Sequence, residues 1–117
     1  MPRFVVLEHD HPELHWDLML EAAGVLQTWR LAQPPDTGSG PIEATELSDH
    51  RIAYLDYEGP VSGKRGRVCR WDAGEFDEAA ESLPEVREFT LRGARARGRV
   101  RLERVAGTKW RFMWLSE

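Results

Sequence analysis

Short apolar segments recur along the whole chain. Clear examples are residues 3–9 (RFVVLEH), 14–21 (LHWDLMLE) and 24–31 (GVLQTWRL). Tight turns, such as residues 22–24 and 106–107, separate neighbouring segments. Short apolar segments bounded by turn residues are read as strands, and strands that recur every ~8 to 12 residues are typical of antiparallel sandwiches and barrels. We therefore expect a mainly β fold, a compact antiparallel β-barrel of about eight short strands.

One segment has the composition of a helix rather than of a strand. Residues 76–86 (FDEAAESLPEV) place Asp77 as a helix N-cap and Pro84 at the point where the helix would end. We therefore expect one or two short helices beside the barrel. The last apolar segment, residues 109–116 (KWRFMWLS), is expected to be a strand.

Length and composition predict a single domain over residues 1–117. Hydrophobic residues make up 41% and charged residues 31%, which allows one buried core and argues against global disorder. Cys69 is the only cysteine, so no intramolecular disulfide can form. Because there is no signal peptide and no long apolar run, we expect a reducing, cytoplasmic location and no membrane partner.

Basic residues are concentrated toward the end of the chain, although the formal net charge is −4. Alternation along a strand would place Arg95, Arg97, Arg99 and Arg101 in one row, opposite small and apolar residues. Such a row can follow a phosphate backbone, which makes nucleic acid the expected partner. The alternative is a solvated outer face whose arginines form salt bridges with acidic residues.

The densest group of chemically active side chains lies in residues 8–17 (EHDHPELHWD). In a strand, His15, Asp17 and Glu21 share one face, and the intervening turn can bring His9 beside His15. Two imidazoles and one carboxylate from adjoining strands form a facial site for a divalent metal, with open coordination positions. The alternative is a polar loop whose histidines are merely exposed.

A further histidine, His50, lies in residues 48–59 (SDHRIAYLDYEG), which we interpret as the polar start of another strand. There it could supply a fourth metal ligand, act as a general acid or contact a phosphate. The alternative is a surface histidine without a chemical role.

Several of these segments, in this order, resemble a known family. The stretches are RFVVLEHDHPELHWDLMLE, GVLQTWRL, DHRIAYLDYEG, GRVCRWDAGEF and LRGARARGRVRLERV, which together span nearly the whole chain. They resemble the 3′-phosphoesterase domain at the N-terminus of bacterial DNA ligase D, which also occurs as a free-standing protein. The resemblance implies a compact β-barrel with flanking helical pieces. It also implies use of a divalent metal, commonly manganese, to trim damaged or ribonucleotide-bearing 3′ ends before ligation.

The resemblance further assigns roles to individual residues. It implies that His9, His15 and Asp17 are the metal ligands. His50 matches the family's active-site histidine near the scissile phosphate, and Tyr54 matches a nearby tyrosine, so we take these two as the catalytic candidates.

The chain differs from the family at positions that bind or polarise phosphate. Leu7 stands where the family has Gln, Met19 and approximately Ile42 where it has Arg, and Ser48 where it has Glu. Removing one preorganised donor can lower the rate roughly 10²- to 10³-fold, so a replacement is needed if the chemistry persists. The candidates for phosphate or nucleic-acid binding are Arg51, Arg65, Arg67, Arg95, Arg97 and Arg99.

Two functions follow from these observations. The first is a divergent, Mn²⁺-dependent phosphoesterase that removes a 3′ phosphate or 3′ ribonucleotide during DNA end repair, with a separate ligase or polymerase as partner. The second is a catalytically degenerate β-barrel that serves as a nucleic-acid or protein interaction module. Metal-dependent turnover would distinguish the first from the second.

Overall fold

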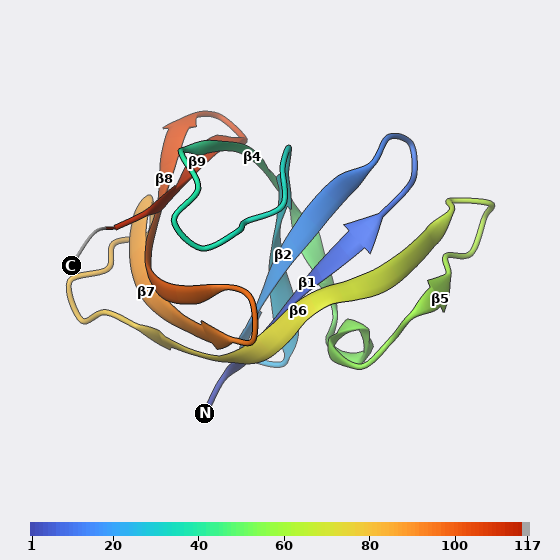
Figure 1. Ribbon diagram of the computed structural model, residues 1–117, viewed down its shortest axis with the longest axis horizontal. Helices are drawn as coiled ribbons and strands as arrows, with labels where there is room; N and C mark the ends of the chain where they lie inside the picture. The colour runs from blue at the N-terminus through green and yellow to red at the C-terminus, as the bar shows by residue number, and fades with distance from the viewer. Residues whose placement is uncertain (116–117) are drawn as a thin grey trace.

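Eight of the nine strands of a single antiparallel sheet close into a barrel (Figure 1). The computed structural model describes residues 1–115. Around the barrel the strands follow the order β1, β2, β3, β4, β9, β8, β7 and β6, and β6 pairs with β1 to close it. The short strand β5 (Gly59–Pro60) pairs only with the outer end of β6. The barrel strands are β1 (Arg3–His9), β2 (His15–Ala22), β3 (Val25–Leu31), β4 (Ile42–Arg51), β6 (Arg67–Glu78), β7 (Val86–Gly93), β8 (Arg97–Ala106) and β9 (Lys109–Trp114). The mainly β, eight-stranded barrel is therefore confirmed.

The expected helix over residues 76–86 is wrong. Phe76 is 3% exposed inside the barrel, and β6 continues to Glu78, which pairs with Phe89 of β7. Only a short turn remains between β6 and β7, and a segment that brief forms a stable helix poorly on its own. Within residues 1–115 there is no α-helix, and the one helical element is the 3₁₀ turn η1 (Ile52–Leu55).

The strand expected to begin near His50 is also absent. His50 lies near the end of β4, and the chain then enters η1. Leu55 of this turn is buried against the outer face of β1, which explains why an apolar sequence here forms a covering turn rather than a barrel strand. The last predicted strand corresponds to β9, and Ser116 lies outside the described residues.

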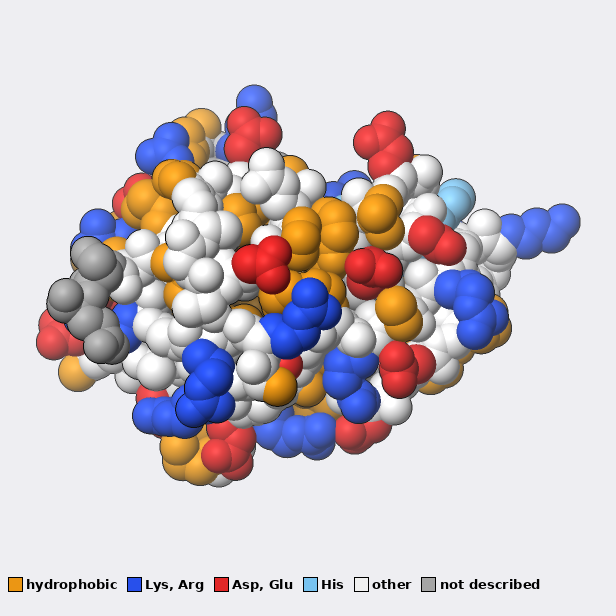
Figure 2. Space-filling view, viewed as in Figure 1, with side chains coloured by type: hydrophobic (Ala, Val, Ile, Leu, Met, Phe, Trp, Pro, Cys, Tyr) orange, Lys and Arg blue, Asp and Glu red, His pale blue; other side chains and the backbone are white. Residues whose placement is uncertain are grey.

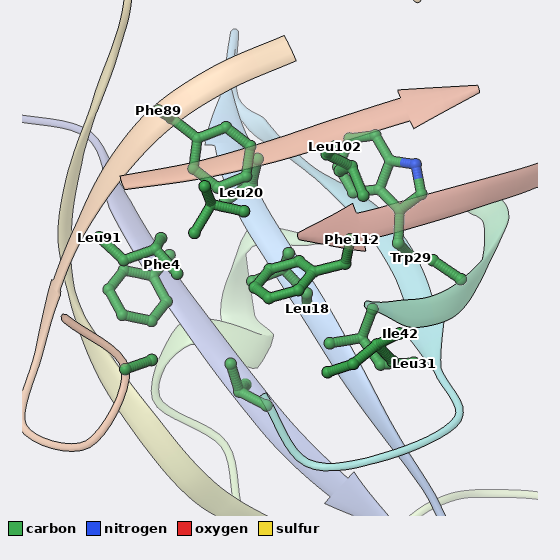
Figure 3. Close-up of a cluster of buried hydrophobic side chains, with 14 of the residues drawn as sticks. Phe4, Leu18, Leu20, Trp29, Leu31, Ile42, Phe89, Leu91, Leu102 and Phe112 are labelled. Atoms are coloured by element: carbon green, nitrogen blue, oxygen red, sulfur yellow. The ribbon is translucent and has the colours of Figure 1, made fainter. Parts of the chain in front are cut away.

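Alternate side chains of the strands fill the barrel interior. Phe4 and Leu18 from the first hairpin meet Phe89 and Phe112 from the opposite wall (Figure 3). Burying an aromatic or large aliphatic side chain stabilises the fold by about 1.5–3 kcal/mol, so this cluster is the main source of stability. The principal members also include Leu20, Trp29, Leu31, Ile42, Leu91, Leu102 and Trp110.

A second apolar cluster lies outside the barrel wall. Val5, Leu7 and Met19 point outward from β1 and β2, and all are fully buried. Leu55 of η1 and Val61, just after β5, cover them. Strands β1 and β2 are therefore buried on both faces along this stretch. Side chains on their outer face next to Leu55 and Val61 are held on a rigid backbone.

A two-residue turn at Ala23–Gly24 joins β2 to β3. Both residues have positive φ, 51° and 83°, which suits the right-handed twist of a tight hairpin. The turn fixes the pairing of Ala22 with Val25 and, further along the same ladder, of Asp17 with Arg30. No helix among residues 1–115 is long and apolar enough to cross a membrane.

Candidate metal centre

The hairpin of β1 and β2 brings His9 and His15 together as direct cross-strand partners. Their ring centroids are 4.9 Å apart, and Asp17 lies two residues further along β2 on the same outer face. One ligand atom from each of the three side chains lies within 4.8 Å of the others. His15 and Asp17 are only 4% and 3% exposed, whereas His9 is half-buried. The sequence-based expectation that these three side chains converge is confirmed.

Both histidines are oriented by backbone carbonyls. His15 Nδ1 lies 2.8 Å from the carbonyl oxygen of Glu13, and His9 Nε2 lies 2.7 Å from that of Arg65. A carbonyl only accepts, so these two ring nitrogens carry the protons and donate. In the neutral form of each ring, His15 Nε2 and His9 Nδ1 then carry lone pairs. Such second-sphere hydrogen bonds are typical of metal-ligating histidines.

Those lone pairs face the carboxylate of Asp17. His15 Nε2 lies 3.2 Å from the carboxylate oxygens of Asp17, and His9 Nδ1 lies 3.7 Å from Oδ2. Within the described residues, Asp17 Oδ1 is buried without a hydrogen-bond partner. Buried lone pairs at such distances repel unless a cation or a proton lies between them. The donor set, two neutral imidazoles and one carboxylate, therefore fits a divalent transition metal.

The loop between β5 and β6 holds this arrangement in place. Gly66 has φ +73°, and a Cβ atom there would lie 2.1 Å from Asp10 Oδ1 and 2.7 Å from His11 Cβ. The backbone N–H of Arg67 donates to the same Asp10 oxygen at 2.8 Å. In Figure 1 the β1–β2 loop and the loop before β6 extend toward the same side of the molecule. This close packing keeps the Arg65 carbonyl against His9.

The catalytic candidates line the same cleft as the metal ligands. The cleft has a volume of about 490 Å³ and is bordered by His9, His15, Asp17, His50 and Tyr54. His50 Nδ1 donates to the Ser48 carbonyl at 3.0 Å, which leaves Nε2 available. Its ring lies 5.7 Å from that of Tyr54, edge to face.

The predicted phosphate-binding arginines fall into separate groups. Arg51 and Arg65 border the metal cleft, and Arg65 also donates from Nε to the Ser62 carbonyl at 2.7 Å. Arg67 instead borders a neighbouring hollow together with Glu8 and Asp10. Only the first two arginines are therefore positioned to meet a ligand in the metal cleft.

The arginine row of β8 lies away from this cleft. Alternation holds as expected, because Val100 and Leu102 point into the core. The Arg99 and Arg101 guanidinium groups both pair with Glu88, at 3.4 and 2.8 Å. Figure 2 shows acidic and basic side chains interspersed over one face of the molecule. For Arg99 and Arg101 the structure matches the salt-bridged alternative.

The other two arginines of the predicted row also make local contacts. The Arg95 guanidinium lies 4.0 Å from the centroid of the Trp71 ring and 4.0 Å from Asp36. Arg97 donates to the Gly93 carbonyl at 2.9 Å. Neither arginine borders the metal cleft. Contact of Arg95, Arg97 and Arg99 with nucleic acid stays a prediction.

The positions that differ from the family have distinct environments. Leu7 and Met19 are buried in the outer apolar cluster beneath the cleft. Ile42 is 1% exposed inside the barrel and points away from the cleft. Ser48 is exposed and contributes its carbonyl to His50. Of the four, Met19 and Ser48 border the cleft itself.

Among the residues that border the cleft and that sequence reasoning did not assign to the site is Arg30. It pairs with Asp17 across β2 and β3, so both side chains lie on the same outer face. A two-residue turn at Ala23–Gly24 pairs Ala22 with Val25, and counting five residues back along each strand pairs Asp17 with Arg30. The hairpin register was therefore the signal that could have identified Arg30.

Comparison with known proteins identifies the family to which the chain is similar. Residues 7–104 match the family described as the DNA Ligase D 3′-phosphoesterase domain. The chain is 36% identical over 114 residues to the multifunctional non-homologous end joining DNA repair protein LigD of Mycobacterium tuberculosis, covering 92% of the chain and 15% of the relative.

Two further relatives are multifunctional non-homologous end joining proteins LigD. The Mycolicibacterium smegmatis protein is 30% identical over 122 residues, covering 92% of the chain and 16% of the relative. The Pseudomonas aeruginosa protein is 32% identical over 111 residues, covering 88% and 13%. The chain thus spans only a small fraction of the length of these relatives. Because the family match covers most of its residues, the chain belongs to the DNA ligase D 3′-phosphoesterase domain family.

Proposed function

We propose that this protein is a divergent, metal-dependent phosphoesterase that acts on nucleic-acid 3′ ends. The observation that carries the proposal is the convergence of the His9, His15 and Asp17 ligand atoms within 4.8 Å, in the cleft that His50 also borders. Membership of a family of 3′-phosphoesterase domains supports a phosphoester as the substrate.

Each cleft residue has a role that its surroundings support. His9, His15 and Asp17 would hold a divalent cation, for which the family resemblance favours Mn²⁺. A bound divalent cation supplies Lewis-acid polarisation of the phosphoryl group and lowers the pKa of a coordinated water. His50 would transfer a proton at Nε2, because its Nδ1 proton is already donated to the Ser48 carbonyl. The Tyr54 ring lies edge to face with that of His50 and would help to orient the imidazole.

The proposed substrate is a DNA end that carries a 3′ phosphate or a 3′ ribonucleotide. The relatives' names connect them with non-homologous end joining, which supports a role in end repair and makes a separate ligase or polymerase the proposed partner. Arg51 and Arg65, at the border of the cleft, would attract the strand that carries the phosphate. A cytoplasmic location is part of the same proposal.

The test is turnover of a primer–template with a 3′ phosphate and of another with a single 3′ ribonucleotide. Wild-type protein should release phosphate from the first and shorten the second when Mn²⁺ is present, and EDTA should abolish both reactions. Protein that is folded and binds Mn²⁺, but that leaves both substrates intact, would contradict the proposal for these substrates.

A second candidate function is an interaction module without catalysis. The observation in its favour is that Leu7 and Met19 are apolar and buried where the family resemblance implies phosphate-binding groups. Such a module should bind DNA with an affinity that falls steeply with salt concentration, and Mn²⁺ should produce no turnover. Measuring the salt dependence of binding beside the turnover assay distinguishes the two functions.

A further inference from the structure

Arg30 is the half-buried cation of the metal cleft. It lies on β3, directly opposite Asp17 of β2 and Thr45 of β4, with its side chain on the outer face of the barrel. Within the described residues its Nε is buried without a hydrogen-bond partner, and its guanidinium forms neither a salt bridge nor a hydrogen bond. A charged group in this state is unfavourable for folding, because burial removes water without supplying a partner.

Other partly buried arginines of the chain are satisfied locally. Arg87 donates twice to Glu78 and once to Gln27, and its guanidinium lies over Trp29. Arg101 donates twice to Glu88. These guanidinium groups hold the fold together and have few donors left for a ligand. Arg30 differs from them because its five N–H donors are uncommitted and it borders a cleft.

The carboxylate of Asp17, the cross-strand partner of Arg30, is engaged elsewhere. Its carboxylate lies against the lone pairs of His15 and His9, at 3.2 and 3.7 Å, and forms no ion pair with Arg30. The cleft therefore contains a set of metal-ligating lone pairs and, on the adjacent strand at the same register, an unpaired guanidinium. This arrangement suits a ligand whose anionic oxygens approach the metal and the guanidinium together.

We propose that Arg30 binds the terminal phosphate of the nucleic-acid substrate and is the main phosphate-binding residue of this cleft. The inference rests on the proposed function, because it takes the 3′ end as the ligand. The planar guanidinium can donate two parallel hydrogen bonds to phosphate oxygens, which a point charge such as lysine cannot reproduce. Met19, which also borders the cleft, offers no hydrogen-bond donor for this task.

The test uses fluorescence anisotropy with two oligonucleotides that differ only in a 3′ phosphate or a 3′ hydroxyl. Mn²⁺ is present, and every protein carries His50→Asn so that turnover does not consume the probe. Arg30→Met should weaken binding of the 3′-phosphate probe roughly 10-fold or more, while binding of the 3′-hydroxyl probe changes by less than about twofold. Arg30→Lys should give an intermediate loss. Arg111→Met, which removes an exposed arginine of β9, is the matched control and should change neither affinity.

A purely structural role for Arg30 makes a different prediction. In that case Arg30→Met would lower the melting temperature and weaken binding of both probes alike. We expect instead an unchanged or higher melting temperature, because the substitution removes an unpartnered, half-buried charge. Arg30→Lys, which retains a charge, provides the same comparison of probes if Arg30→Met does not fold.

Two results would overturn the inference: equal binding of both probes by the parent protein, or an undiminished phosphate preference in the Arg30 variants. The proposed function fails on a separate measurement, namely the absence of Mn²⁺-dependent phosphate release by the wild-type protein from the 3′-phosphate probe.

Discussion

Asp17 and Arg30 lie opposite each other across β2 and β3, yet their opposite charges do not pair. The carboxylate turns toward His9 and His15, and the guanidinium lies in the cleft without a partner among the described residues. Neighbouring opposite charges that stay apart leave both available to external ligands. A bound metal ion would neutralise the Asp17 carboxylate, and a phosphate group would pair with the Arg30 guanidinium. The two residues would therefore place the metal and the phosphate side by side in the cleft.

Replacing Asp17 by Asn should abolish stabilisation by Mn²⁺. A ligand at 100 times its dissociation constant raises the free energy of unfolding by about 2.7 kcal/mol, and this increment should disappear with the carboxylate. In EDTA, Asp17→Asn should be at least as stable as wild type, because the amide can donate to the lone pair of His15. Thermal melts with Mn²⁺ and with EDTA measure both effects. Asp36→Asn, in an exposed loop, should keep the full response to Mn²⁺. An undiminished shift in Asp17→Asn would remove Asp17 from the metal site.

Gly66→Ala should weaken Mn²⁺ binding as well as stability. The added Cβ would overlap Asp10 and His11. Relieving that overlap would displace the backbone at residue 66 and, with it, the neighbouring Arg65 carbonyl that orients His9. Gly63→Ala is the matched control, since Gly63 has φ +74° in the same loop and its nearest neighbour to a Cβ is Arg65 Nε at 3.6 Å. Both variants carry the backbone cost of positive φ, of the order of 1 kcal/mol. Calorimetric titration with Mn²⁺ should show weaker binding for Gly66→Ala alone. Equal losses in the two variants would show that loop strain, rather than the contact with Asp10 and His11, governs the site.

Asp72→Ala should destabilise the barrel strongly without touching the cleft. The buried Asp72 carboxylate accepts backbone N–H bonds from Ala94, Arg95 and Ala96, at 3.0, 3.0 and 2.7 Å. Its removal leaves three backbone donors of the β7–β8 turn unsatisfied, of which that of Ala96 is buried, and this should lower the free energy of unfolding by about 2–4 kcal/mol. Urea denaturation measures the loss, and Glu75→Gln on the exposed face of β6 serves as the control. A loss below about 0.5 kcal/mol would mean that water replaces the carboxylate in this turn.

Acid should remove one specific contribution to stability. Hydrogen bonding from Arg87 holds the pKa of Glu78 below its ordinary value of 4.5, although partial burial acts in the opposite direction. Since the folded-state pKa is the lower one, this stabilisation is present above the unfolded value and is lost as the pH falls through the folded value. Wild type should therefore be more stable than Glu78→Gln at pH 7, and the difference should shrink progressively below about pH 4.5. Urea melts from pH 7 to pH 3 measure the difference. A difference independent of pH would rule out the Arg87 interaction as its source.

The features that could be predicted from the sequence are those with a local cause. Short apolar runs bounded by turn residues identified β1 and β2 almost to the residue, because both strands are buried on both faces over much of their length. The alternation of side-chain direction along a strand, together with a short connecting loop, was enough to bring His9, His15 and Asp17 together. A site made from one hairpin depends on no distant part of the chain.

The features that escaped prediction depend on long-range packing. Residues 76–86 have helical composition, but Phe76 is needed inside the barrel and pairing with β7 extends the strand. Residues 52–55 are apolar because they pack on the outer side of β1. No local pattern distinguishes an apolar turn that packs on the outside of the barrel from an apolar strand of the barrel itself. The importance of Arg30 depends on the absence of a partner, which only the positions of all its neighbours can reveal.

The most direct test of the central claim is steady-state phosphate release from a 3′-phosphate primer–template in Mn²⁺, with wild type compared with His15→Ala. Leu14→Ala, an exposed neighbour in the same loop, is the control. We predict Mn²⁺-dependent release by wild type and Leu14→Ala, and a loss of at least about 100-fold in His15→Ala that remains folded. Equal release by His15→Ala and wild type, or no release by Mn²⁺-bound wild type, would contradict hydrolysis at the His9, His15 and Asp17 centre.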